Sequence, residues 1–245
     1  MRSSSTRHTN YPKSHKPESN QFTLMTQALT QSLNLRTVAF TLLCVSSSFA
    51  HADNYSADVW ADNWFALYIN GEQVAEDSVP ITTERSFNAE SFSFYAEKPF
   101  TIGLIAKDFK ENDSGLEYIG SRRQQMGDGG VIVQIKDASG NTVAVTDDSW
   151  VCLVTHEAPL DKSCANEDNP VAGEGACAFK TTETPSDWNL PNFDDNNWQA
   201  ASVYSEQQVS PKQGYDRISW DSSAQLIWGP DLETNNTILC RLTVN

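Results

Sequence analysis

The feature that most constrains the fold is a succession of short apolar runs whose large residues recur at every second position. Within residues 63–70, Phe65, Leu67 and Ile69 share one face, and residues 100–106 repeat the same spacing. A period of two is the repeat of a half-buried β-strand. No window of a dozen residues shows a convincing 3.6-residue apolar repeat, so long helices are not expected.

The other runs have the same short length and are separated by Gly, Pro, Asn and Asp. Strands are expected at 86–95, 116–119, 131–135, 142–146, 151–155, 200–204, 225–228 and 237–244. Many short strands with turn residues between them indicate an all-β sandwich or barrel, and a chain of this length forms such a core as a single domain. Residues 157–185 interrupt the pattern, because they are polar and contain two cysteines. They are predicted to form a long loop insertion.

The first 52 residues have the composition of an export signal. Basic residues precede an apolar run at 38–50, which ends in Ala50-His51-Ala52, the small-x-small form that signal peptidases accept. The run is too short to span a bilayer. A transit peptide is the alternative, but the cleavage motif favours secretion to the exterior or the periplasm. We therefore expect a signal peptide at 1–52, with translation starting at Met25, and a mature domain at 53–245.

Four cysteines remain after such processing: Cys152, Cys164, Cys177 and Cys240. An even number in an exported chain indicates two disulfides, and three pairings are open. We favour Cys164–Cys177, which closes a short polar loop, and Cys152–Cys240, which joins two apolar runs. A zinc site is disfavoured because the chain has no C-x-x-C pair.

The charge and the motifs exclude several classes of function. The chain carries 17 Lys and Arg against 32 Asp and Glu, a formal net charge of −15. Such a surface repels phosphate backbones and anionic lipids, so nucleic acids and membranes are poor partners. His156 is the one histidine of residues 53–245, and neither G-x-S-x-G nor H-E-x-x-H occurs. The sequence therefore does not predict an enzyme.

Two motifs resemble those of one known class of domain. Residues 188–198, WNLPNFDDNNW, are similar to the W-x-x-P-x-F-D-D-x-x-W segment of galactose-binding-domain-like jelly rolls, the accessory modules of bacterial glycosidases. Residues 61–71 resemble their hairpin ending in Asn-Gly, and residues 226–241 their closing strands, with an arginine in the last one. The resemblance implies a jelly-roll β-sandwich. It also implies that the two tryptophans and the phenylalanine pack a turn capped by the Asp pair.

Sugar binding requires an exposed aromatic ring with amide and carboxylate groups beside it. Trp60 and Trp220 lie next to polar, turn-like residues and are the preferred platforms. Loops at one end of a jelly roll are free to vary, so binding groups are expected there. The predicted ligand-binding residues are Trp60, Asp62, Asn63, Trp220, Asp221 and Asn235.

Calcium is the one cofactor that the composition suggests, because it takes six to eight oxygen ligands. The polar stretch at 108–117 offers Asp108, Asp113 and Glu117, although it lacks the spacing of an EF-hand. By the resemblance, Asp62-Asn63 and Asn235-Asn236 would form a second acidic and amide set. Solvated turn residues are the alternative interpretation.

These observations predict a secreted, non-catalytic module that binds carbohydrate or another extracellular ligand, with an extracellular glycan or a surface protein as its partner. A structural or interaction module without a small-molecule site is the first alternative. A glycan-active enzyme of unrecognised type is the second.

Overall fold

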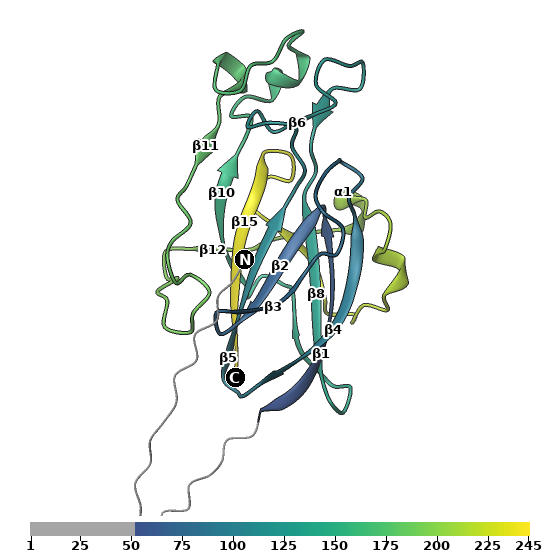
Figure 1. Cartoon of the computed structure of the whole chain (residues 1–245), viewed down its shortest axis with the longest axis vertical. Helices are drawn as coiled ribbons and strands as arrows, with labels where there is room; N and C mark the ends of the chain where they lie inside the picture. Colours follow the sequence, from purple (N-terminus) through teal and green to yellow (C-terminus); the bar gives the residue numbers. More distant parts are fainter. Residues whose placement is uncertain (1–51) are drawn as a thin grey trace, which may run out of the picture. The chain divides into compact units, whose positions relative to one another are not determined.

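Residues 52–245, which the computed structural model describes, form two antiparallel β-sheets that pack against each other (Figure 1). The prediction of an all-β sandwich is confirmed. The predicted signal peptide lies outside the described residues, apart from Ala52.

The first sheet has the strand order β13-β14-β8-β1-β4, with β9 beside β8. Its strands are β1 (Asp53–Asp62), β4 (Asn88–Ala96), β8 (Gly130–Asp137), β9 (Thr142–Val145), β13 (Ser202–Tyr204) and β14 (Leu226–Trp228). The second sheet has the order β11-β10-β15-β5-β2-β3, with β12 beside β10. Its strands are β2 (Trp64–Ile69), β3 (Glu72–Glu76), β5 (Phe100–Lys107), β10 (Val151–Glu157), β11 (Lys180–Thr181), β12 (Gln199–Ala200) and β15 (Asn235–Val244).

The remaining elements are short and lie in the connections between strands. They are the hairpin β6 (Leu116–Glu117) and β7 (Gln125–Met126), the 3₁₀ helices η1 (Lys162–Asn166), η2 (Gly175–Cys177) and η3 (Tyr215–Arg217), and the helix α1 (Glu206–Val209). α1 is one turn long and begins with a capping box, in which the Ser205 and Gln208 side chains each bind the other residue's backbone N–H.

The period-two faces predicted from the sequence form the core between the sheets. Phe65, Leu67, Ile102 and Leu104 are fully buried there. Strand β1 also contributes, with Tyr55, Ala57, Val59 and Ala61 buried at alternate positions, although the sequence did not predict it. Burying apolar surface at roughly 25 cal/mol per Å² is the main stabilising contribution to such a fold.

The chain passes directly from one sheet to the other between β1 and β2. Only Asn63 separates them, and its N–H donates to the Lys107 carbonyl at 2.8 Å. Since β8 and β5 run antiparallel to β1 and β2, the start of β8 and the end of β5 lie at this crossing. The aspartate cluster described below lies at this end of the sandwich.

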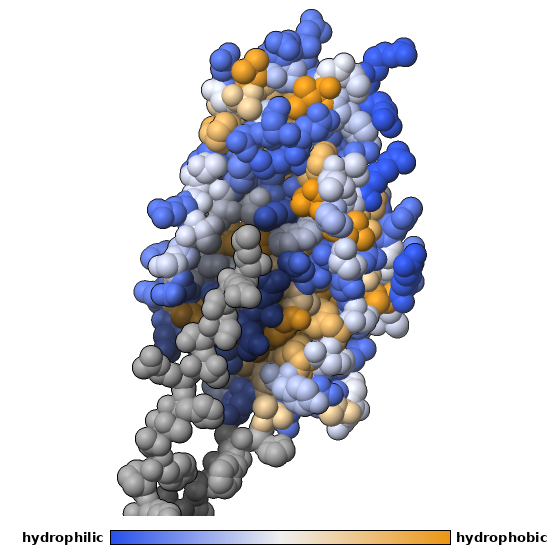
Figure 2. Space-filling model, in the orientation of Figure 1, coloured by the Kyte–Doolittle hydropathy of each residue, from blue (hydrophilic) through white to orange (hydrophobic). Residues whose placement is uncertain are grey.

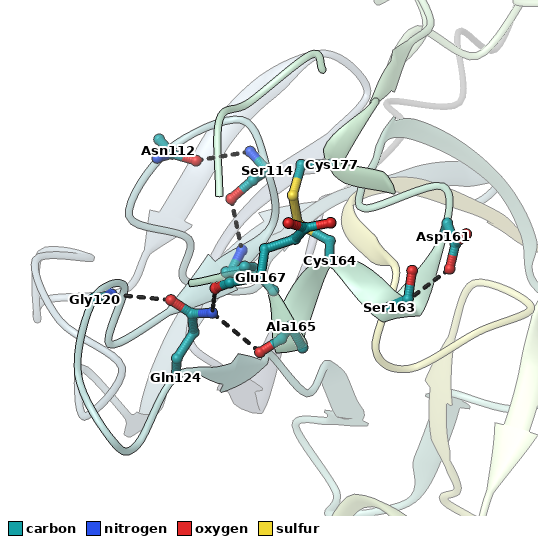
Figure 3. Close-up of a disulfide and its surroundings, with 11 residues drawn as sticks. Asn112, Ser114, Gly120, Gln124, Asp161, Ser163, Cys164, Ala165, Glu167 and Cys177 are labelled. Atoms are coloured by element: carbon teal, nitrogen blue, oxygen red, sulfur yellow. Dashed lines mark hydrogen bonds between the residues drawn. A yellow bond between two sulfur atoms is a disulfide. The ribbon is translucent and has the colours of Figure 1, made fainter. Parts of the chain in front are cut away.

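The predicted insertion at 157–185 contains the two short helices η1 and η2, joined by the Cys164–Cys177 disulfide (Figure 3). Both cysteines are buried against Leu116 of β6. Gln124 ties the insertion to the β6–β7 hairpin, because its Nε2 donates to the Ala165 and Glu167 carbonyls at 3.0 and 2.8 Å (Figure 3). The second disulfide joins Cys152 of β10 to Cys240 of β15, so both favoured pairings are confirmed.

The surface shown in Figure 2 is mainly hydrophilic, with hydrophobic residues scattered over it. Within residues 52–245, no helix has the length and apolar character needed to cross a membrane.

Asp77, just after β3, is a buried acid that should make stability depend on pH. Its Oδ1 accepts from the Val79 N–H at 2.8 Å, whereas Oδ2 has no partner among the described residues. Burial, reinforced by the negative charge of Glu90, raises the pKa of Asp77 to about 6. The folded protein therefore binds this proton more tightly than the unfolded chain. The resulting stabilisation is complete below about pH 4 and is lost as the pH rises through about 6.

We therefore expect Asp77→Asn to be more stable than the wild type at pH 7.5, by about 1–2 kcal/mol, and about equal to it at pH 4. Urea denaturation at the two pH values measures this difference. The exposed Asp148→Asn is the control and should change stability by less than about 0.5 kcal/mol at either pH. A variant less stable than the wild type at pH 7.5 would contradict the expectation.

Candidate functional site

Three aspartates converge at the crossing between the sheets. Asp62 ends β1, Asp108 directly follows β5, and Asp128 lies two residues before β8. The register of the sheets brings them together, because Asp62 pairs with Gly130 at the start of β8 and the Asp108 N–H donates to the Asn236 carbonyl at the start of β15. One carboxylate oxygen of each lies within 4.8 Å of those of the others. We call these three residues the aspartate cluster.

Lys212, from the loop after α1, reaches into the edge of the aspartate cluster. Its ammonium lies 2.9 Å from Asp62 Oδ2 and 2.7 and 2.9 Å from the two oxygens of Asp128. Asp62 is 1% exposed, whereas the side chain of Asp128 is 40% exposed and that of Lys212 is 35% exposed. The lysine thus neutralises part of the charge from the solvent side.

Asp108 is the least compensated member of the cluster. It is 3% exposed, and neither of its carboxylate oxygens has a hydrogen-bond partner within residues 52–245; the same holds for Asp62 Oδ1. Gly127 leaves the space for this carboxylate, because a Cβ at that position would lie 2.1 Å from Asp108 Oδ2. An unpartnered buried carboxylate is costly, so this arrangement requires an explanation.

The electrostatics of the site reflect this burial. Burial, with the nearby Asp128 carboxylate, raises the pKa of Asp62 to about 7. Burial and the carboxylates of Asp62 and Glu117 raise the pKa of Asp108 well above its ordinary value. Burial alone would lower the pKa of Lys212, but Asp62 and Asp128 raise it above the usual range. The cluster therefore favours a cation.

A pocket of about 540 Å³ opens beside the aspartate cluster. Asp128 of the cluster lines it, and so does Lys212, which pairs with the cluster. We call it the Tyr118 pocket. It is lined by Glu84, Arg85, Phe87, Glu117, Tyr118, Gln125, Asp128, Lys212 and Gln213. Aromatic, amide and charged groups from three separate chain segments thus face one cavity.

Contacts of the lining residues with one another and with Arg123 hold the Tyr118 pocket in shape. The Tyr118 hydroxyl donates to Glu84, and the Arg123 guanidinium lies 4.2 Å from the centre of the Tyr118 ring. The Gln125 amide donates to Glu117 Oε2 at 2.9 Å. Burial raises the pKa of Glu117 to about 7, against the lowering effect of that hydrogen bond.

A second concavity of about 520 Å³, the Trp198 groove, lies along β10, β12 and the Gly229–Asn235 turn. Trp198, Asn197, Lys162 and Asn235 are among its lining residues. Lys162 is paired there with Asp231 and Glu233 at 2.8 and 2.7 Å. The groove therefore offers an aromatic ring and polar groups. None of the residues that line it, all of them described, is a buried acid without a hydrogen-bond partner.

The structure corrects the prediction that Trp60 is an exposed platform. Trp60 is completely buried, because it belongs to β1, and β1 lies between β4 and β8 in the sheet. Its Nε1 donates to the Gln213 carbonyl at 3.1 Å. Trp220 is half-buried against the same apolar cluster, and its Nε1 donates to the Tyr215 carbonyl at 3.1 Å. Neither tryptophan lines the Tyr118 pocket or the Trp198 groove.

The other predicted ligand-binding residues lie in different parts of the fold. Asp62 belongs to the aspartate cluster, and Asn63 braces that end, donating to the Glu84 carbonyl and accepting from the Phe109 N–H. Asp221 accepts from the Ser223 hydroxyl within its own turn and from the Thr142 hydroxyl at the start of β9. Asn235 is buried, accepts from the Asp231 N–H and borders the Trp198 groove. The six residues do not form one site.

Two of the three acids predicted to bind calcium lie at the crossing, and one does not. Asp108 is in the aspartate cluster and Glu117 is close enough to raise its pKa. Asp113 instead pairs with Lys110 at 2.5 Å and lies 3.4 Å from His156 Nε2. The predicted acids Asp108, Asp113 and Glu117 therefore do not form one group: Asp108 is in the aspartate cluster, Glu117 is near it, and Asp113 lies apart.

The segment at 188–198 packs onto the outer side of β15 and β5. Trp188 and Trp198 are stacked, Phe193 meets the Trp198 ring edge-on, and Asp194 Oδ1 accepts from the Asn196 N–H within the turn. Arg241 of β15 is 2% exposed and holds the segment through Asp195 and the Trp188 carbonyl. The residues of this segment therefore pack against β15, and none of them lines the Tyr118 pocket, although Asn197 and Trp198 line the Trp198 groove.

Comparison of the chain with protein-family models, with curated proteins and with solved structures gives no match.

Proposed function

We propose that this protein is an exported, non-catalytic module that binds carbohydrate in the Tyr118 pocket. The observation that carries the proposal is the composition of the lining, in which Phe87 and Tyr118 stand among amide and charged side chains. Sugars present apolar C–H faces and hydroxyls that both donate and accept, and a site for them combines aromatic rings with such polar groups.

The charges of the Tyr118 pocket favour one class of sugar. Three carboxylates, from Glu84, Glu117 and Asp128, face it together with two cations, Arg85 and Lys212. With Glu117 ionised the lining has one excess negative charge, and with Glu117 protonated its charges balance, so in neither state does it have a net positive charge to attract sulfated or uronic acid residues. Neutral or amino sugars are therefore the preferred ligands.

A glycan-active enzyme is the second candidate, and one observation favours it. Glu117, with its raised pKa, has the protonation behaviour of a general acid, and Asp128 is a second carboxylate in the same pocket. Binding without cleavage remains our preferred function, because Lys212 already pairs with Asp128 and the amide of Gln125 with Glu117.

The test is a glycan array probed with the labelled protein in calcium-containing buffer. We expect binding to a limited set of neutral or amino-sugar glycans, with no cleavage of those glycans after prolonged incubation. Binding of none of the glycans would favour the structural or interaction module, and cleavage would favour the enzyme.

Two matched amide variants show where the glycan binds. Gln213→Ala removes a side chain that lines the Tyr118 pocket and has no hydrogen bond among the described residues. Asn197→Ala makes a comparable change in the Trp198 groove. We expect the array signal to fall for Gln213→Ala and to persist for Asn197→Ala.

A further inference from the structure

We infer that the aspartate cluster of Asp62, Asp108 and Asp128 is a calcium-binding site, built into the crossing between the two sheets beside the Tyr118 pocket. The inference concerns a cation and does not depend on what occupies the pocket.

The unpartnered oxygens point to a missing ligand. Asp108 and Asp62 are at least 97% buried, and three of their four carboxylate oxygens lack a partner within residues 52–245. One carboxylate oxygen from each of the three aspartates lies within 4.8 Å of those of the other two. Oxygens that bind one calcium ion at about 2.3–2.6 Å are at most about 5 Å apart, so the spacing fits a single ion.

The charge balance matches a divalent ion. Three carboxylates and the ammonium of Lys212 leave two negative charges uncompensated. Lys212 binds Asp62 Oδ2 and both oxygens of Asp128, so Asp62 Oδ1 and both Asp108 oxygens are the ones without a hydrogen bond. Asp128 would bind the ion through a carboxylate oxygen that also accepts from Lys212. Glu117 adds negative potential from the side of β6.

The donor set selects the kind of ion. The cluster offers carboxylate oxygens only, which suit the hard cations calcium and magnesium and disfavour zinc and copper. Magnesium requires a nearly ideal octahedron at about 2.0–2.1 Å, whereas calcium accepts irregular sets of carboxylates and carbonyls. Three aspartates that arrive from three strand ends form an irregular set, which favours calcium.

Gly127 is the structural feature that makes room for this site. A Cβ would meet Asp108 Oδ2 and force that carboxylate to move. The space that Gly127 leaves therefore allows the carboxylate of Asp108 to lie within the cluster. Burying this carboxylate is costly unless a cation compensates its charge.

The experiment is a calorimetric titration of calcium chloride into EDTA-treated, dialysed protein, with thermal melting in parallel. We expect one saturable site and a melting temperature that rises with calcium concentration. Magnesium chloride should bind at least tenfold more weakly. Absence of saturable calcium binding would overturn the inference, and equal or tighter magnesium binding would overturn the assignment to calcium.

Asp108→Asn separates a cation site from a purely structural acid. Without calcium, the variant should melt at or above the wild-type temperature, because it removes a buried acid whose ionisation no partner compensates. With calcium, it should melt below the wild type and bind the ion at least a hundredfold more weakly. Asp62→Asn should show the same loss of affinity.

Asp113→Asn is the matched control, because it removes the same charge from the same polar stretch outside the cluster. It should retain wild-type calcium affinity. Loss of binding in Asp113→Asn together with normal binding in Asp108→Asn would contradict the site. None of these measurements involves a glycan, so their failure would leave the carbohydrate proposal standing, and the reverse also holds.

Discussion

Replacing Cys152 and Cys240 together with alanine is expected to lower the free energy of unfolding by roughly 4 kcal/mol. The two residues lie directly opposite each other on β10 and β15 and are separated by 88 residues in the sequence. Cross-linking such distant positions removes much of the conformational freedom of the unfolded chain. A loss of this size is a large share of the roughly 5–15 kcal/mol that stabilises a typical domain.

The Cys164–Cys177 pair provides the comparison for this prediction, because it closes a loop of 13 residues. The chain-entropy model gives about 3 kcal/mol for such a loop, less than for the longer one. Urea denaturation of the two double variants shows which of them loses more of the free energy of unfolding. A larger loss in Cys164→Ala/Cys177→Ala than in Cys152→Ala/Cys240→Ala would contradict the account.

Arg241→Ala is expected to cost about 3 kcal/mol and to lower the melting temperature by roughly 6–12 °C. The guanidinium is 2% exposed and donates to Asp195 Oδ2 at 2.7 Å and to the Leu190 carbonyl at 3.1 Å. It also lies 5.1 Å from the centre of the Phe193 ring. Truncation leaves these acceptors without their cation, so the segment at 188–198 loses its attachment to β15.

Arg217→Ala is the control for Arg241→Ala, because Arg217 is an exposed arginine of η3. It should change stability by less than about 0.5 kcal/mol. Adding Asp195→Asn to Arg241→Ala should recover part of the loss, because it removes the carboxylate left unpaired. A melting temperature of Arg241→Ala within 2 °C of the wild type would show that the contact is not stabilising.

The strands with large apolar residues at alternate positions were predictable from the sequence. The expected runs at 63–70, 100–106 and 237–244 correspond to β2, β5 and β15. Strand β1 was missed because two of its four core-facing residues, Ala57 and Ala61, are small. Its apolar signal is therefore weak, although it is a central strand of its sheet.

That omission also explains the wrong placement of Trp60. Without β1, residues 60–63 fit a polar loop before a strand, in which a tryptophan would be exposed. In the structure the same residues end a central strand, so Trp60 is core and Asp62 is buried at its end.

The candidate site was predictable only in part, because it depends on sheet register. Asp62 and Asp108 were chosen for their residue type, and the structure brings them together. Asp128, between Gly127 and Gly129, could have been found from its place just before a strand. Lys212 could not, because it comes from a loop 84 residues beyond Asp128 and no local pattern marks it. Tyr118 was likewise missed, since the sequence-based search for platforms considered tryptophans.

The disulfide-bearing insertion gains a role from its contacts. It binds the β6–β7 hairpin through Gln124 (Figure 3) and packs on Leu116 of the same hairpin. That hairpin carries Glu117, Tyr118 and Gln125. The Cys164–Cys177 bridge therefore supports one wall of the Tyr118 pocket.

The most direct test of the proposed function is the affinity of Gln213→Ala for the glycan that gives the strongest array signal, measured by calorimetric titration against the wild type and Asn197→Ala. Binding in the Tyr118 pocket predicts a loss of about tenfold, or about 1.4 kcal/mol, for Gln213→Ala. It also predicts an unchanged affinity for Asn197→Ala. The reverse result, with Asn197→Ala weakened and Gln213→Ala unchanged, would place binding in the Trp198 groove and contradict the account.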